Sequence, residues 1–168
     1  MEFRDKSPIM MSRRPQGFTL IELIVVIIIL AILAATALPR FADLQVRARV
    51  AKLNGALGAM KGAASLAHAG CLAGSPQCTA TLLMEGVNIT MIHAYPTADA
   101  GGIVTAAGIT AGPTSDDGFN TELGGAAAGA TLRMMVTGND PPNCSFTYSA
   151  PIAANQSPTF GPLVTSGC

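Results

Sequence analysis

A single carboxylate lies inside an otherwise apolar stretch near the N-terminus. From Phe18 to Leu38 the chain has 21 residues, and only Glu22 among them carries a charge. A helix rises about 1.5 Å per residue, so this stretch is roughly 30 Å long when helical, enough to cross the hydrocarbon layer of a bilayer. A carboxylate in such a span is costly. We therefore expect Glu22 to have a partner, and we expect another molecule to supply it.

Three interpretations of this N-terminus are open. It is a secretory signal peptide, with Arg13 and Arg14 as its basic region and Ala35-Thr36-Ala37 as the cleavage site. Alternatively, it is an uncleaved single-pass anchor. In the third interpretation the chain is cut between Gly17 and Phe18, so the apolar helix stays on the mature protein. The charge within the apolar region and the length of that region weigh against a signal peptide.

The residues around this third cut resemble the leader of type IV pilins and of the related pseudopilins. The matching features are a short basic leader ending at Gly17, the segment from Phe18 to Leu23, an apolar stretch, and Pro39 near its end. The resemblance implies that a membrane prepilin peptidase cleaves after Gly17 and N-methylates Phe18. It also implies that Glu22 pairs with the methylated amine of a neighbouring subunit during assembly. A buried carboxylate and a buried ammonium are each costly alone and tolerable as a pair.

The leader, residues 1–17, is longer than usual for this family. A start at Met11 in place of Met1 would give a compact leader. Arg13 and Arg14 keep the N-terminus cytoplasmic by the positive-inside rule, so the rest of the chain lies across the membrane. We expect a single-pass inner-membrane protein before assembly and an extracellular pilus afterwards.

Helical periodicity continues beyond the apolar span (18–38) into a second segment, residues 39–70. Pro39 removes a backbone donor, which predicts a kink just before it, and Gly70 is the expected end of the helix. Glycines at spacings of three and four mark a thin face that allows close packing, although an alanine- and glycine-rich sequence accounts for them equally well: Gly55, Gly58 and Gly62. An apolar stripe predicts the face that packs on a sheet: Phe41, Leu44, Ala48, Ala51, Leu53, Leu57, Met60, Ala64 and Ala67.

Charge is divided between this helix and the remaining sequence. Basic residues dominate the helix, where Asp43 stands against Arg40, Arg47, Arg49, Lys52 and Lys61. Acidic residues dominate beyond it, where Arg133 stands against Glu85, Asp99, Asp116, Asp117, Glu122 and Asp140. Both groups are interpreted as solvated surface. A basic stem and an acidic head would also attract each other between neighbouring copies.

Residues 71–168 form the expected globular head. Alternation from Val87 to Tyr95 predicts a strand ended by Pro96, and Thr97 is the expected cap of a helix reaching Ala107. Residues 113–120 are a predicted polar loop. Strands are predicted at 131–136, 145–149 and 163–165. The fold class is therefore α+β: a long N-terminal helix, transmembrane in its first half, packed on a small antiparallel sheet.

Four cysteines suggest two disulfides in an extracytoplasmic compartment. Three pairings are possible, and the nearest-neighbour one suits two separate loops: Cys71 with Cys78, and Cys144 with Cys168. We expect no metal or cofactor, because the spacings match no usual zinc site and His68 and His93 lack companion ligands. Two adjacent acids, Asp116 and Asp117, fall short of a calcium shell and are better interpreted as a polar turn.

The head also resembles pilins of the mannose-sensitive haemagglutinin type. The resemblance rests on Tyr95-Pro96-Thr97-Ala98 with Gly102-Ile103, and on Cys144 to Tyr148 followed by the end Thr165 to Cys168. It implies a type IV pilus subunit, and not an enzyme, whose C-terminal cysteine loop faces outward. The implied partners are identical subunits, a prepilin peptidase, the inner-membrane assembly machinery and a host or surface receptor. The roles expected are adhesion, surface attachment or motility.

Two other functions remain open. One is a pseudopilin of a type II secretion system, which shares the helix and which an ordered calcium in the head would favour. The other is a minor pilin at the tip, acting as an adhesin or in DNA uptake. Direct nucleic-acid binding is not expected, because the acidic head lacks the clustered Lys and Arg that phosphates require.

Overall fold

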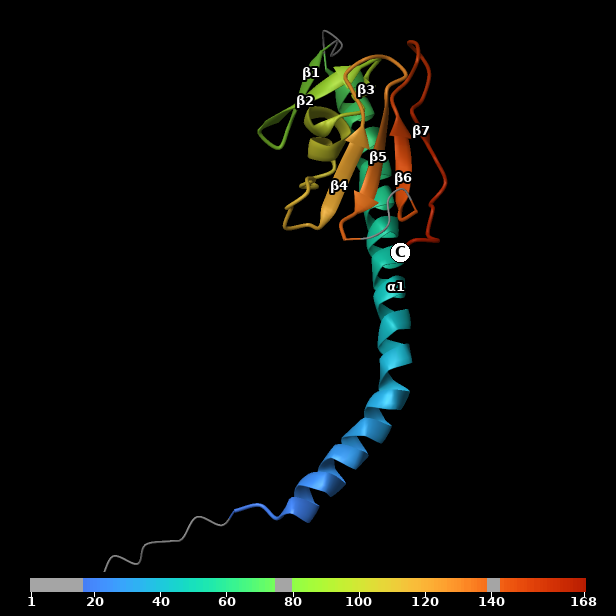
Figure 1. Cartoon of the computed structure of the whole chain (residues 1–168). Coiled ribbons are helices and arrows are strands. Elements are labelled where there is room, and N and C mark those ends of the chain that lie inside the picture. Colours follow the sequence, from blue (N-terminus) through green and yellow to red (C-terminus); the bar gives the residue numbers. More distant parts are fainter. Residues whose placement is uncertain (1–16, 75–79, 139–142) are drawn as a thin grey trace, which may run out of the picture. The chain divides into compact units, whose positions relative to one another are not determined.

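The computed structural model of this chain describes residues 17–74, 80–138 and 143–168. It divides into two compact units, Met1–Ala42 and Asp43–Cys168. A long helix is followed by seven short strands and one short helical segment (Figure 1). The expected α+β fold class, a long apolar helix followed by a small antiparallel sheet domain, is confirmed.

The helix α1, Leu20–Ala73, contains 54 residues and includes Pro39. Within the first unit its large apolar side chains are exposed, Leu30 at 58% and Leu33 at 58% among them. In the part of the chain that the structure describes, this is the one helix long and apolar enough to cross a membrane. The helix also continues three residues past its predicted end, because Gly70 keeps helical geometry and packs beside Leu82.

In the second unit, one face of α1 forms part of the core. The predicted stripe is right from Leu53 onward, since Leu53, Met60, Ala64 and Ala67 are all at most 3% exposed. It is wrong before that point, because Leu44, Ala48 and Ala51 are exposed. The head's core contacts the helix only from about Val50 onward. The earlier part of the stripe therefore has no apolar partner among the described residues of its own unit.

Two antiparallel sheets make up the head. The first has the order β1-β2-β3: Thr81–Met84, Val87–Ile92 and Tyr95–Pro96. The second has the order β4-β5-β6-β7: Phe119–Leu123, Thr131–Val136, Ser145–Ser149 and Thr159–Phe160. The predicted strands at 131–136 and 145–149 are confirmed as β5 and β6.

The predicted strand from Val87 to Tyr95 is broken near its C-terminal end. His93 and Ala94 have positive φ angles of 50° and 65°, and Ile92 pairs with Tyr95 across them. Two residues with positive φ close a tight hairpin, so the chain reverses into β3. Strands β1 and β7 were not predicted, and β4 begins at the end of the predicted polar loop. The predicted strand at 163–165 is reduced to one bridge between Val164 and Ser145.

The helix predicted from Thr97 is a short irregular segment, η1, Ala100–Val104. Its cap is Asp99, whose Oδ1 accepts a hydrogen bond from the Gly102 amide at 2.7 Å, so Thr97 was the wrong cap. Thr97 is instead buried and donates to Asp99 Oδ1 at 2.9 Å. A Cβ on Gly102 would lie 2.3 Å from Thr97 Oγ1, which only glycine avoids.

A buried tyrosine joins the two sheets. Tyr148 of β6 has no exposed surface, and its hydroxyl donates to the carbonyl oxygen of Pro96 in β3 at 2.7 Å. Burial raises the pKa of the Tyr148 hydroxyl, so this group stays protonated and remains a donor. The hydrogen bond ties the second sheet to the edge of the first.

Candidate functional site

The first turn of α1 is closed by a reciprocal pair of side chain to backbone hydrogen bonds. Thr19 precedes the first helical residue, Leu20, and Glu22 is the third. The amide of Glu22 donates to Thr19 Oγ1 at 3.3 Å, while the amide of Thr19 donates to Glu22 Oε2 at 2.9 Å. The Thr19 hydroxyl also donates to the same Glu22 oxygen at 2.8 Å. This arrangement is a capping box, which satisfies two amides that the helix itself leaves unpaired.

Thr19 is a functional residue that our reasoning from the sequence missed. We expected the partner of Glu22 to come from another molecule, and the structure adds one within the chain. The signal was present in the sequence, because Thr-x-x-Glu before an apolar run is the spacing of a capping box. Glu22 also lies where the helix dipole favours a negative charge, in the first turn. The carboxylate is thus held by local groups before any neighbour arrives.

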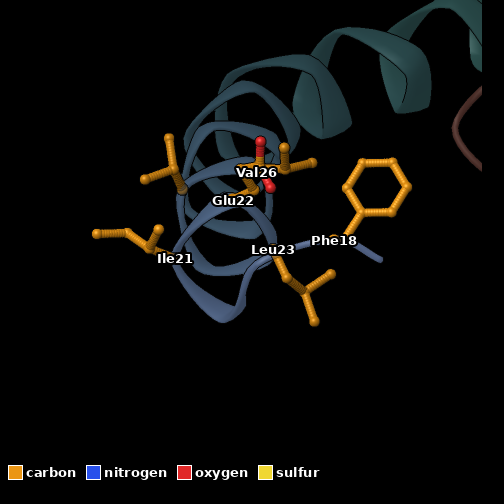
Figure 2. A pocket seen from close by; sticks show the side chains of 6 residues that line it. Phe18, Ile21, Glu22, Leu23 and Val26 are labelled. Atoms are coloured by element: carbon orange, nitrogen blue, oxygen red, sulfur yellow. The ribbon is translucent and has the colours of Figure 1, made fainter. Parts of the chain in front are cut away.

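Around this cap, the surface is apolar and open. Phe18 is 93% exposed, and a shallow concavity along the helix is lined by Phe18, Ile21, Glu22, Leu23, Val25 and Val26. Figure 2 shows Phe18 and Leu23 projecting from one side of the first turn and Ile21 from the other. Among the described residues, nothing lies within 4 Å of the position that a Cβ on Gly17 would take. The Gly17–Phe18 bond is therefore accessible in this structure.

Basic residues of the stem hold the head. Arg49 donates to the carbonyl oxygen of Cys168 at 2.7 Å. Lys52 donates to the carbonyl oxygen of Gly118 at 3.3 Å, and its Nζ lies 4.7 Å from the centre of the Phe119 ring. The Nζ of Lys61 lies 5.6 Å from the centre of the Phe160 ring. Three of the basic residues interpreted as solvated surface therefore contact the head of their own chain.

A disulfide closes the C-terminal loop. Cys144 and Cys168 are bonded at 2.06 Å and are nearly buried, which is the pair expected from the sequence. Cys71 is buried in a second core cluster with Ala67, Ile89 and Met91, and it too is disulfide-bonded. Its expected partner, Cys78, lies outside the described residues.

The acidic turn is held by its own loop. Asp117 Oδ2 accepts hydrogen bonds from the Thr110 hydroxyl at 2.6 Å and from the Thr110 amide at 2.8 Å. These bonds hold the pKa of the Asp117 carboxyl below its ordinary value, with a smaller contribution from Lys52. Asp117 thus closes the loop between Thr110 and β4, and Asp116 beside it is exposed.

Both histidines belong to or contact the β2–β3 hairpin. The ring of His68 stacks on Tyr95 with centroids 4.1 Å apart, and its Nδ1 is 3.0 Å from the carbonyl oxygen of Ala94. His68 therefore fixes the β2–β3 hairpin to α1. His93 occupies the first turn position of that hairpin.

The N-terminal segment matches a known protein-family model. Residues 12–38 match the family model described as the prokaryotic N-terminal methylation motif. The type IV narrow pilus major component PilA5 of Thermus thermophilus is 46% identical over 54 residues, 32% of this chain and 47% of that protein. The fimbrial protein EcpC of Eikenella corrodens is 45% identical over 56 residues, 33% of this chain and 37% of that protein.

These matches are confined to part of each protein. The chain spans less than half the length of the curated relatives it matches. No solved structure matches the chain. The match to the methylation motif thus lies at residues 12–38, and the similarity to the two pilus proteins covers 32% and 33% of this chain.

Proposed function

We propose that this chain is a structural subunit of a type IV pilus. The observation that carries the proposal is the methylation motif at residues 12–38, which coincides with an exposed apolar helix start holding a capped carboxylate. The matching relatives are a pilus major component and a fimbrial protein. Their similarity covers 32% and 33% of this chain and supports a structural role in a pilus.

Processing by a prepilin peptidase is the first step that we propose. Cleavage after Gly17 frees the amine of Phe18, and methylation leaves this amine charged. The accessible Gly17–Phe18 bond and the absence of any atom near the Gly17 Cβ position support a cut here. The new ammonium and the Glu22 carboxylate are then a complementary pair that neighbouring subunits bring together. Pairing lowers the cost of placing both charges in an apolar medium.

Burial of the apolar helix is the second step. Between residues 18 and 38 the large apolar side chains are 42% to 93% exposed, so this surface must be covered by something outside the chain. We propose that lipid of the inner membrane covers it before assembly, with the N-terminus cytoplasmic. The assembly machinery then exchanges this lipid for the helices of identical subunits, and the mature pilus is extracellular.

The finer part of this proposal, the type of pilin, is based on the head. The C-terminal loop closed by Cys144 and Cys168 supports a pilin of the mannose-sensitive haemagglutinin type, with roles in adhesion, attachment or motility. A type II secretion pseudopilin with calcium in the head is less well supported, because one carboxylate oxygen of Asp117 already accepts hydrogen bonds from Thr110. Among the described residues, no three His, Cys, Asp or Glu side chains gather as metal ligands.

Mass spectrometry of filaments sheared from the cell surface tests the proposal. We expect the chain to be a component of the filament, with a methylated Phe18 as its N-terminal residue. The Gly17→Val variant should accumulate as an uncleaved membrane precursor, because a side chain crowds the peptidase at this position. An N-terminus after Ala37 would instead identify a secretory signal peptide, and an intact leader on a protein absent from filaments would identify a simple anchor.

A further inference from the structure

On the stem, one cation of the second unit, Arg47, has no hydrogen bond or ion pair with the residues that the structure describes. Arg49, Lys52 and Lys61 all contact the head of their own chain. Arg47 is exposed, and no hydrogen bond or ion pair joins it to any described residue. Asp43 lies one turn before Arg47, yet the two form no ion pair in the described residues. The charge of Arg47 is therefore available to another molecule.

On the head, three of the five acidic side chains in the described residues are already engaged. Glu122 forms an ion pair with Arg133 at 3.2 Å, Asp117 is held by Thr110, and Asp99 caps η1. Asp116 and Glu85 are exposed and have no such bond among the described residues. Asp116 immediately precedes Asp117, which lines a groove between α1 and the loop before β4. The groove is lined by Lys52, Gly55, Ala56, Ala59, Gly108, Ile109, Asp117 and Phe119.

Small residues make this groove shallow enough for another backbone to approach. Nothing lies within 4 Å of the Cβ positions of Gly55 and Gly108, so both open directly onto free space. Phe119 is buried beneath, and at the rim the negative charges of Asp117 and the adjacent Asp116 outnumber the positive charge of Lys52, which also lines the groove. An apolar helix face with one flanking cation has the chemistry to fit this site.

The stem of this same chain presents such a face. Leu44, Arg47, Ala48 and Ala51 lie at i, i+3, i+4 and i+7, and so share one side of α1. All four are exposed, with Leu44 at 61%. They belong to the part of the predicted apolar stripe that the head does not cover. The exposed apolar residues of this face and the charge of Arg47 are thus chemically complementary to the groove and its net negative rim.

We propose that the stem face Leu44–Ala51 of one copy docks into the groove beside Asp116 of a second copy, an inference that rests on the proposed pilus function. Arg47 of one copy then pairs with Asp116 of the other, while Leu44 and Ala48 pack against Gly55, Ala59 and Ile109. The face and the groove are different surfaces of the same chain, so the contact is heterologous. Each copy offers both surfaces, and the contact repeats into an open filament.

Cysteine cross-linking in assembled filaments tests the geometry. The full chain carrying both Arg47→Cys and Asp116→Cys should give a ladder of covalent multimers with a flexible bismaleimide cross-linker, because an Arg–Asp ion pair holds the two Cα atoms too far apart for a direct disulfide. Two single-cysteine variants expressed together should give one heterodimer, and each expressed alone should give none across this contact. A Glu85→Cys variant paired with Arg47→Cys is the matched control. Filaments that give no heterodimer, or as much with Glu85→Cys, would overturn the docking.

Charge reversal tests the energetics separately. We expect Arg47→Glu and Asp116→Lys each to lower filament yield at least tenfold, and the double variant to recover most of it. Glu85→Lys changes the charge equally and should leave the yield within twofold. Subunit levels in the membrane control for folding. Wild-type yields from both single variants would overturn the pairing while leaving the pilus function intact. A wild-type chain that never enters filaments would refute the pilus function itself.

Discussion

The cap of α1 gives a prediction whose size follows from the structure. Thr19→Val keeps the shape of the side chain but removes the hydroxyl. Two of the three hydrogen bonds between Thr19 and Glu22 are lost, and the bond from the Thr19 amide remains. Loss of a capping threonine costs about 0.5–2 kcal/mol of helix stability. Fraying of the first turn should therefore become roughly 2- to 30-fold more frequent, by the Boltzmann factor of that energy.

Hydrogen exchange of the full chain in detergent measures this change. Peptides covering residues 17–23 should exchange faster by this factor in Thr19→Val, while peptides from the middle of α1 stay unchanged. Thr36→Val is the matched control, because the Thr36 hydroxyl donates only to the Leu33 carbonyl within the helix, at 2.9 Å. Equal exchange of the first turn in both variants would refute the capping interpretation.

The variant Glu22→Gln separates the role of Glu22 in the cap from the role of its charge. A glutamine carbonyl still accepts from Thr19, so the first turn should exchange much as it does in the wild type. Its neutral amide cannot form an ion pair with an ammonium, so filament number should fall sharply while the precursor is cleaved and inserted normally. Glu22→Ala should lose both properties. Normal filament numbers from Glu22→Gln would show that the charge pair does not drive assembly.

Two further outcomes concern the head. Tyr148→Phe leaves the buried Pro96 carbonyl without a donor, which costs about 1–3 kcal/mol and lowers the urea midpoint by about 0.5–1.5 M. The control Tyr95→Phe removes an exposed contact of 3.5 Å to Ser157 and should change little; equal effects would contradict the role of Tyr148. For Asp117, a lowered folded-state pKa means that its bonds to Thr110 stabilise the loop above its unfolded pKa and are lost as pH falls through the folded pKa. In the wild type, exchange of the Thr110 amide, corrected for intrinsic exchange, should accelerate as the pH falls. In Asp117→Asn this acid acceleration should be absent, and an unchanged acid response in that variant would contradict the role of Asp117.

The sequence predicts the regular strands of the head better than its turns. Strands β5 and β6 are found at their predicted bounds, because β-branched, aromatic and other apolar residues recur along them. The β2–β3 turn escapes prediction, because His93 and Ala94 adopt positive φ without glycine. Tertiary contacts support that conformation, among them the stack of His68 on Tyr95. Strand β4 is mostly polar, and its pairing with β5 is what makes it a strand.

Some of the candidate site is also visible only in three dimensions. The unusual charge of Glu22 is evident from the sequence, and its partner Thr19 is evident from the spacing once a helix start is assumed. The contacts of Arg49, Lys52 and Lys61 are not, because their acceptors are backbone carbonyls and aromatic rings 66 or more positions away in the chain. Oppositely charged side chains give a sequence signal, whereas carbonyl oxygens give none. A charge count therefore overestimates how many stem cations are free to attract a neighbour.

The geometry of Glu22 also bears on how a subunit exists before assembly. The cap uses one carboxylate oxygen, Oε2, which accepts both bonds from Thr19. A carboxylate has about four lone-pair sites, so the other oxygen keeps its capacity to accept from an ammonium. Capping and pairing between subunits are then compatible, and a neighbour's amine need not displace Thr19. The Glu22 carboxylate is held by local donors of its own chain, and in the proposed pilus a neighbour would add an ionic partner to a carboxylate already in position. Because Thr19 already fixes the side chain of Glu22, that side chain would lose less conformational entropy when subunits associate.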